Sequence, residues 1–246
     1  SRDSFDKIPL NKSLGIICFS ACSLLFLIAF GLPFVQLLVW SDLSETFFSV
    51  PNIKLFMNSG FLGFFTASLI SITALVLSLA YAGSTKMRGI FTAATIGYAL
   101  PGSVIAVGLL IVINEILGVS ITSMGIFGLV LCLSIRFMTP AFQYLISSLE
   151  NIPESSKKAL STLPVNSIKA FTSLYLPSMR PAILVAFLVV FIEVVKEQPA
   201  TLILRPVGFE TLSSKIYNFT SEGQWELAAN PSLLLVMLSF ILVYFL

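Results

Sequence analysis

Long apolar segments dominate this chain of 246 residues and limit the folds that it can adopt. Hydrophobic residues make up 57% of the sequence and charged residues only 11%, and the mean hydropathy is +0.97. Soluble domains usually contain about 25% charged residues, so this chain has too little polar surface to cover itself in water. We therefore expect an integral membrane protein whose partners include membrane lipid.

Six segments reach the length of about 20 apolar residues that one membrane crossing requires. The predicted spans are 14–40, 59–81, 91–116, 125–145, 181–204 and 227–246. Bundled helices form one unit in lipid, so residues 1–246 are interpreted as a single all-α transmembrane domain.

The distribution of lysine and arginine predicts the orientation of the chain, because cytoplasmic loops carry an excess of these residues. A cytoplasmic N-terminus places nine basic residues inside and three or four outside. The inner set is Arg2, Lys7, Lys12, Lys86, Arg88, Lys157, Lys158, Lys169 and Arg180, and the outer set is Lys54, Arg205, Lys215 and, near the membrane edge, Lys196.

Several classes of function are excluded or disfavoured by residues that the sequence lacks. It contains no histidine, which excludes an imidazole-type transition-metal site, and its three cysteines are interpreted as small hydrophobic residues. No GxxxxGK[ST] motif for ATP binding occurs. A net charge of only +2 gives no indication of nucleic-acid binding, and no nucleophile–base arrangement suggests an enzyme.

Residues 150–177 form a polar, basic segment between the fourth and fifth spans, on the predicted cytoplasmic side. Such a segment is typical of a docking platform for a cytoplasmic partner protein. The alternative is an amphipathic helix that lies on the lipid surface.

Within this segment, the pattern predicts two short helices, 155–163 and 168–175. Pro164 would end or kink the first, because proline disfavours helical backbone in the residue before it. Asn166 or the next residue can cap the second helix, and Pro177 is expected to close it.

The same segment resembles the coupling-helix loop of ABC importer permeases, in which a Glu-Ala-Ala run is followed by glycine and later by Leu-Pro. Residues 158–160, Lys-Ala-Leu, align with Glu-Ala-Ala, so lysine replaces the acid, and proline replaces the glycine. The resemblance implies that the contact with an ATPase involves Lys158, Ala159, Leu160, Leu163, Pro164, Leu176 and Pro177.

Two further stretches, 97–110 and 196–236, resemble ferric-iron ABC importer permeases. The most specific parts are 198–202 (QPATL), 204–206 (LRP) and 208–212 (GFETL). The resemblance implies the type I ABC importer permease fold. It also implies that this chain is the C-terminal half of a permease with two homologous halves, consistent with a sequence that starts at Ser1 and stops inside an apolar run.

The resemblance further implies a function and a set of partners. The chain would be a permease subunit in a bacterial inner membrane, moving ferric iron to the cytoplasm by alternating access. Its expected partners are a dimer of cytoplasmic ABC ATPases, a second transmembrane half and a periplasmic ferric-iron-binding protein. ATP would bind to the partner subunit, so this chain itself would hold no cofactor and would be no enzyme.

Charged residues near the outer end of the fifth span are candidates for the transport path. Glu193, Lys196 and Glu197 share one helix face at spacings of three and four, and a charge there is costly unless it is paired or hydrated. Carboxylates suit a hard trivalent cation, so Glu193 and Glu197 could line a transient metal site. The alternative is a self-neutralising triplet that locks the span to its neighbours.

Other residues are assigned to the pathway or its gate with an alternative open for each. Pro199 could break the fifth span so that residues 200–206, including Arg205, re-enter as non-helical backbone, or it could only kink the helix. Pro101 presents the same choice in the third span. Arg136 is expected to snorkel or to pair, and a role near an inner gate is the alternative.

Two other functions remain open at this stage. One keeps the permease but changes the cargo, for instance to thiamine or another small solute; aromatic lining would favour an organic cation, and oxygen lining would favour iron. The other is an ATP-independent channel or secondary transporter, which would have no ATPase partner.

Overall fold

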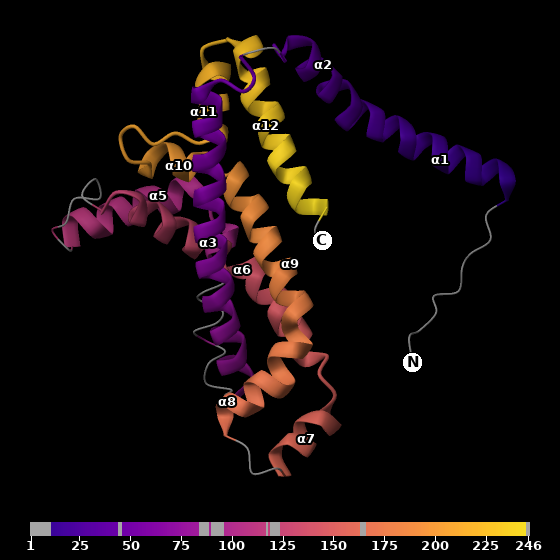
Figure 1. Ribbon diagram of the computed structural model, residues 1–246, viewed down its shortest axis with the longest axis vertical. Coiled ribbons are helices and arrows are strands. Elements are labelled where there is room, and N and C mark those ends of the chain that lie inside the picture. The colour runs from indigo at the N-terminus through magenta and orange to yellow at the C-terminus, as the bar shows by residue number, and fades with distance from the viewer. Residues whose placement is uncertain are drawn as a thin grey trace.

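The computed structural model describes residues 11–43, 46–83, 89, 96–116, 118, 124–162 and 166–244. Over these residues the chain consists of helices and their connections, with no strand. Three long helices form the centre of an elongated bundle, and an apolar arm extends from one end of it (Figure 1). The all-α membrane fold predicted from the sequence is confirmed.

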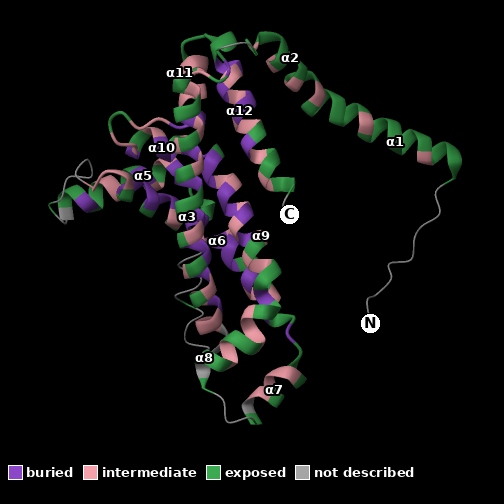
Figure 2. Cartoon of the chain, in the orientation of Figure 1, coloured by how far each residue is buried: buried purple, intermediate pink, exposed green. Residues whose placement is uncertain are grey.

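The arm is a continuous rod of α1 (Lys12–Phe26), the π-helical turn η1 (Leu27–Gly31) and α2 (Leu32–Trp40). None of its residues is buried, and Figure 2 shows it only in the colours of exposed and intermediate residues. It returns to the bundle through α2, which packs against α12 (Trp225–Tyr244). Because the arm is apolar on every side, its surroundings must be lipid or another protein surface.

The core lies where α3 (Val50–Gly83), α6 (Ile126–Glu150) and α9 (Leu176–Lys196) pack against one another. Small residues allow these helices to approach closely, as is usual in membranes. The small residues are Gly63, Ala67, Ala74, Ala141 and Ala186, and the large side chains that fill the space around them include Leu62, Ile70, Leu133, Phe137 and Phe142.

Five short helical segments complete the upper half of the bundle as drawn in Figure 1. They are η2 (Ile96–Ala99), α5 (Gly102–Ile111), the π-helical turn η3 (Val112–Ile116), α10 (Pro199–Leu204) and α11 (Leu212–Ser221). α10 contacts both α5 and α6. α11 begins with a capping box, in which the backbone N–H of Ser214 donates to Thr211 Oγ1 and the Ser214 hydroxyl accepts from the Thr211 N–H.

At the opposite end, α6 leads into α7 (Glu154–Thr162), followed by α8 (Ser167–Ala170) and the π-helical turn η5 (Phe171–Tyr175). The expected cap of the second helix is present, because the Lys169 N–H donates to Asn166 Oδ1 at 2.8 Å. Leu163 and Pro164, the predicted bend, lie outside the described residues.

Five helical stretches are long and apolar enough to cross a membrane, among the residues that the structure describes. They are Lys12–Trp40, Val50–Tyr81, Ile126–Glu150, Ile168–Lys196 and Trp225–Tyr244. The predicted third span differs, because Pro101 interrupts the segment and the apolar helix after it, Gly102–Glu115, is too short to cross.

One prediction about a proline residue is wrong, and another is right only in part. Pro177 does not close the helix before it: η5 continues directly into α9, where Pro177 occupies the first turn and needs no N–H partner. Pro199 does interrupt the fifth span, the first of its two interpretations, but most of residues 200–206 are not the non-helical backbone expected there, because residues 199–204 are helical. They form the new helix α10, again with proline in the first turn.

A larger side chain at Gly63 should loosen the contact between α3 and α9. A Cβ atom there would lie 2.8 Å from Val195 Cγ2 and 3.1 Å from the Phe191 ring, whereas a Cβ at Gly60 meets nothing within 4 Å. We expect Gly63→Leu to cost about 1–3 kcal/mol by overpacking. Thermal melting of the purified protein in detergent measures this loss, and Gly60→Leu, one turn away, is the matched control. Equal melting temperatures for the two variants would contradict this packing.

Candidate functional site

An ion pair between Arg136 and Glu197 lies in the interior of the bundle. Arg136 Nε is 3.4 Å from Glu197 Oε2, and the Glu197 side chain is only 7% exposed. Arg136 comes from the middle of α6, and Glu197 is the first residue after α9. The contact is ionic rather than a hydrogen bond, because Nε lacks hydrogen-bond geometry to any partner. Of the two interpretations of Arg136, the structure thus supports pairing.

The start of α5 packs directly against this ion pair. Arg136 Nη1 donates a hydrogen bond to the Leu100 carbonyl oxygen at 3.2 Å. A Cβ atom at Gly102 would collide with Glu197 Oε1 and lie 2.6 Å from Arg136 Nη1. A larger residue at position 102 would therefore force the two charged side chains to shift. Pro101, the residue just before it, has extended backbone and precedes the first turn of α5.

Backbone and hydroxyl groups bind the rest of Glu197. Its Oε1 accepts a hydrogen bond from the Ala200 N–H at 3.3 Å, so the carboxylate caps the first turn of α10. Its carbonyl oxygen accepts from the hydroxyls of Thr201 and Ser213, each at 3.0 Å. Glu197 thus connects α9, α10 and α11, and Arg136 adds α6 and the start of α5.

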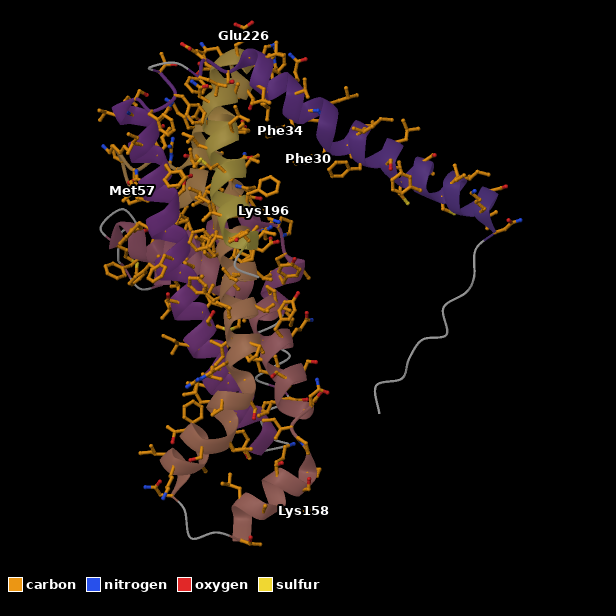
Figure 3. The ribbon with its side chains drawn as sticks, turned by 45° about the vertical axis from the view of Figure 1, so that its right-hand side comes forward. Phe30, Phe34, Met57, Lys158, Lys196 and Glu226 are labelled. Carbon is orange, nitrogen blue, oxygen red and sulfur yellow. The ribbon has the colours of Figure 1, made fainter. Side chains whose placement is uncertain are left out.

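Glu193 and Lys196 form a separate ion pair at the end of α9. Lys196 Nζ lies 2.6 Å from Glu193 Oε1, and the Lys196 side chain is 54% exposed (Figure 3). The prediction that Glu193, Lys196 and Glu197 share one helix face is wrong, because α9 ends at Lys196 and Glu197 has extended backbone. Each carboxylate therefore has its own cation.

Two adjoining hollows lie along α6 and α9, between the two ion pairs and the end of the bundle that carries α7. One has a volume of about 500 Å³ and is lined by Tyr98, Thr139, Pro140, Gln143, Tyr144, Ser147 and Val189. The other, of about 570 Å³, is lined by Tyr144, Ser147, Ser148, Asn151, Ile152, Pro153, Ser178, Pro181, Ala182 and Val185. Tyr144 and Ser147 line both, so the two hollows adjoin. They are together called the α6–α9 groove below.

Sequence analysis did not identify the polar residues of the α6–α9 groove. Thr139, Gln143, Ser147 and Asn151 recur every four residues and therefore follow one face of α6. This spacing within an apolar span was the available signal. It was overlooked because none of these residues is charged.

Arg205 does not line the groove and belongs to a separate polar cluster with Glu210, Ser214 and Lys215. Its guanidinium Nη1 is 3.1 Å from Glu210 Oε1 and 3.4 Å from the Ser214 hydroxyl, and Lys215 Nζ is 3.7 Å from Glu210 Oε2. These contacts connect the end of α10 to α11. They support a structural role for Arg205, and its predicted role in a gate remains a hypothesis.

The predicted docking residues lie at the tip of the bundle opposite α11. Lys158 and Ala159 are exposed on α7, Leu160 is half-buried, and Lys158 marks the tip in Figure 3. At the start of this helix, Lys157 donates a 3.0 Å hydrogen bond to Glu154 and lowers the pKa of the Glu154 carboxyl. Leu176 and Pro177 lie apart from α7, where η5 meets α9.

Among the described residues, no group of three or more histidine, cysteine, aspartate or glutamate side chains could hold a metal ion. The candidate site is thus an open polar groove beside a buried ion pair.

Comparison with known proteins relates the chain to iron transport proteins. It is 26% identical over 242 residues to the Fe(3+)-transport system permease protein FbpB 2 of Haemophilus influenzae, a match that covers 95% of this chain and 47% of the relative. It is also 28% identical over 121 residues to the ferric transport system permease protein FbpB of Actinobacillus pleuropneumoniae, covering 49% of this chain and 18% of that protein. The chain thus spans about half the length of FbpB 2. No protein-family model matches the chain.

Among solved structures, the chain resembles one from a study entitled "Inward facing conformations of the MetNI methionine ABC transporter: CY5 native crystal form". The TM-score is 0.58 at 18% identity, and the match covers 78% of this chain and 88% of the other. At this identity the likeness shows the fold alone, which is that of an ABC transporter permease.

The two ion pairs should differ sharply in their effect on stability. Arg136→Met leaves the buried Glu197 carboxylate without its cation, which we expect to cost about 3–5 kcal/mol. Lys196→Met removes an exposed lysine from Glu193 and should cost at most about 1 kcal/mol. Thermal melting in detergent measures both losses.

The double variant Arg136→Met/Glu197→Gln should regain much of the stability that Arg136→Met loses, because no buried charge is left unpaired. If the double variant melts no higher than Arg136→Met, the loss comes from packing and not from the isolated carboxylate.

Proposed function

We propose that this chain forms part of the transmembrane permease of an ATP-driven importer that moves ferric iron into the cytoplasm of a bacterium. The observation that carries the proposal is the similarity to the Fe(3+)-transport permease FbpB 2 over 95% of the chain. The fold of an ABC transporter permease supports the same assignment independently of sequence identity.

The energy for transport comes from a partner ATPase dimer that docks on α7. Two observations support this location. The helix projects beyond the membrane-spanning core as a separate tip (Figure 1). Its Lys158, Ala159 and Leu160 also align with the coupling motif that the sequence resembles. The excess of basic residues at this end supports a cytoplasmic location, with the arm entering from the cytoplasm and the membrane being the inner membrane.

A second transmembrane half completes the permease, and a periplasmic iron-binding protein delivers the cargo. The α6–α9 groove is open along its length, with Tyr98 and Tyr144 each about half-exposed, so another surface is needed to enclose a path. The second half supplies that surface. Dimerisation of the ATPases on binding ATP then rocks the halves and exposes the path alternately to the two sides of the membrane.

Vesicle transport tests this function directly. The full permease is reconstituted in vesicles with its ATPase and binding protein. It should take up radiolabelled ferric iron only when ATP is present on the side of the membrane that carries the ATPase. Iron uptake without ATP would support the alternative of a channel or secondary transporter. ATP-dependent uptake of methionine or thiamine without iron would show a different cargo on the same fold.

A large charged residue on α7 should uncouple the permease from its ATPase. We expect Ala159→Arg to reduce co-purification of the ATPase and ATP-dependent uptake by about tenfold or more, because a buried, unpaired charge would face the docking surface. Ser221→Arg, an exposed position at the far end of α11, is the control and should leave both unchanged. Normal ATPase binding by the Ala159 variant would place the docking site elsewhere.

A further inference from the structure

We propose that the α6–α9 groove contacts the ferric ion through oxygen atoms of side chains that are neutral before the ion binds, with the phenol oxygens of Tyr98 and Tyr144 as the main contacts. This inference rests on the proposed function, since it names the groups that an iron permease would use. It replaces the predicted carboxylate lining by Glu193 and Glu197 as the place where the cargo is held.

The chemistry of the groove suits a hard cation. Its polar lining consists of phenols, hydroxyls and amides, from Tyr98, Thr139, Gln143, Tyr144 and Ser147 in the first hollow. The second hollow adds the hydroxyls of Ser148 and Ser178 and the amide of Asn151. Hard ions prefer such oxygen ligands, and none of the residues that line the two hollows carries sulfur or imidazole, the donors that softer metals prefer.

The absence of charge among these lining residues suits transport rather than storage. No lining residue of either hollow is acidic or basic. A cage of carboxylates carries its negative charge before the ion arrives and would hold a trivalent cation permanently, whereas this lining is neutral until the ion binds and becomes neutral again when it leaves, as conduction through a pore requires. A phenol can still respond to the ion: when its oxygen coordinates ferric iron, the O–H bond breaks and water takes the proton, which leaves one compensating negative charge.

The carboxylates that the sequence singled out are less suited to this contact. Glu197 is buried, its carboxylate contacts Arg136 and the Ala200 N–H, and it does not line either hollow. Glu193 is neutralised by Lys196. Glu193 and Lys196 follow Val185 and Val189, which line the groove, on the same face of α9. The Glu193–Lys196 pair therefore lies at the end of the groove and not along it.

The two tyrosines also raise a specific alternative, because aromatic rings can stack on an organic cation. Phenylalanine separates the two explanations, since it keeps the ring and removes only the phenol oxygen. Leucine removes both.

The test uses the full permease with its ATPase and binding protein in vesicles, with radiolabelled ferric iron as the cargo. Tyr98→Phe/Tyr144→Phe should lower ATP-dependent iron uptake by about tenfold or more, the loss expected when oxygen contacts to a charged group disappear. Tyr217→Phe, which removes one exposed phenol from α11, should have no effect. Basal ATP hydrolysis and thermal melting of all variants should equal those of the unmodified protein, which shows intact folding and assembly.

The outcomes separate this inference from the proposed function. If the unmodified permease takes up no iron, the proposed function fails. If it does and the double phenylalanine variant keeps the full rate, the inference fails and the function stands. If the phenylalanine variant keeps the full rate of iron uptake while Tyr98→Leu/Tyr144→Leu loses it, the rings act by packing or stacking and the phenol oxygens are not the contact.

Discussion

The ion pair between Arg136 and Glu197 connects more of this structure than any other polar contact described above. A charged group in an apolar interior must be paired, and here the pairing requires that α6, the end of α9 and the start of α5 meet at one point. Gly102 lets α5 approach, and the Ala200 N–H draws α10 onto the same carboxylate. The breaks in the third and fifth spans thus meet at this ion pair, and the contacts around it are called the junction below.

This junction separates the two ends of the bundle. On one side, Arg205, Glu210 and Lys215 connect α10 with α11. On the other side, the α6–α9 groove extends toward α7 without a charged lining residue. The charged residues at the end of the fifth span are thus engaged in ion pairs, and the residues that line the groove are uncharged.

Hydropathy was sufficient to predict an all-helical membrane protein, and proline correctly marked the interruptions at Pro101 and Pro199. Proline was misleading at Pro177, because a residue in the first turn of a helix needs no N–H partner and the pattern does not reveal where that turn begins. The charged residues of the fifth span were misjudged for a related reason. Their spacing placed Glu193 and Glu197 together only if α9 continued, and it ends at Lys196. The uncharged groove residues on α6 were overlooked, although their four-residue spacing was visible.

The sequence alone therefore determined the properties that depend on local composition: the membrane environment, the helical segments and the positions where proline interrupts them. Only the tertiary structure decided which charges pair and which face of α6 is left open. Those outcomes depend on contacts between segments far apart in the chain, such as Arg136 with Glu197 and Leu100, and on the space left between packed helices. The periodicity of a single helix can mark a polar face, as the four-residue spacing on α6 does, but it does not encode which neighbours pair with its charges or leave that face open.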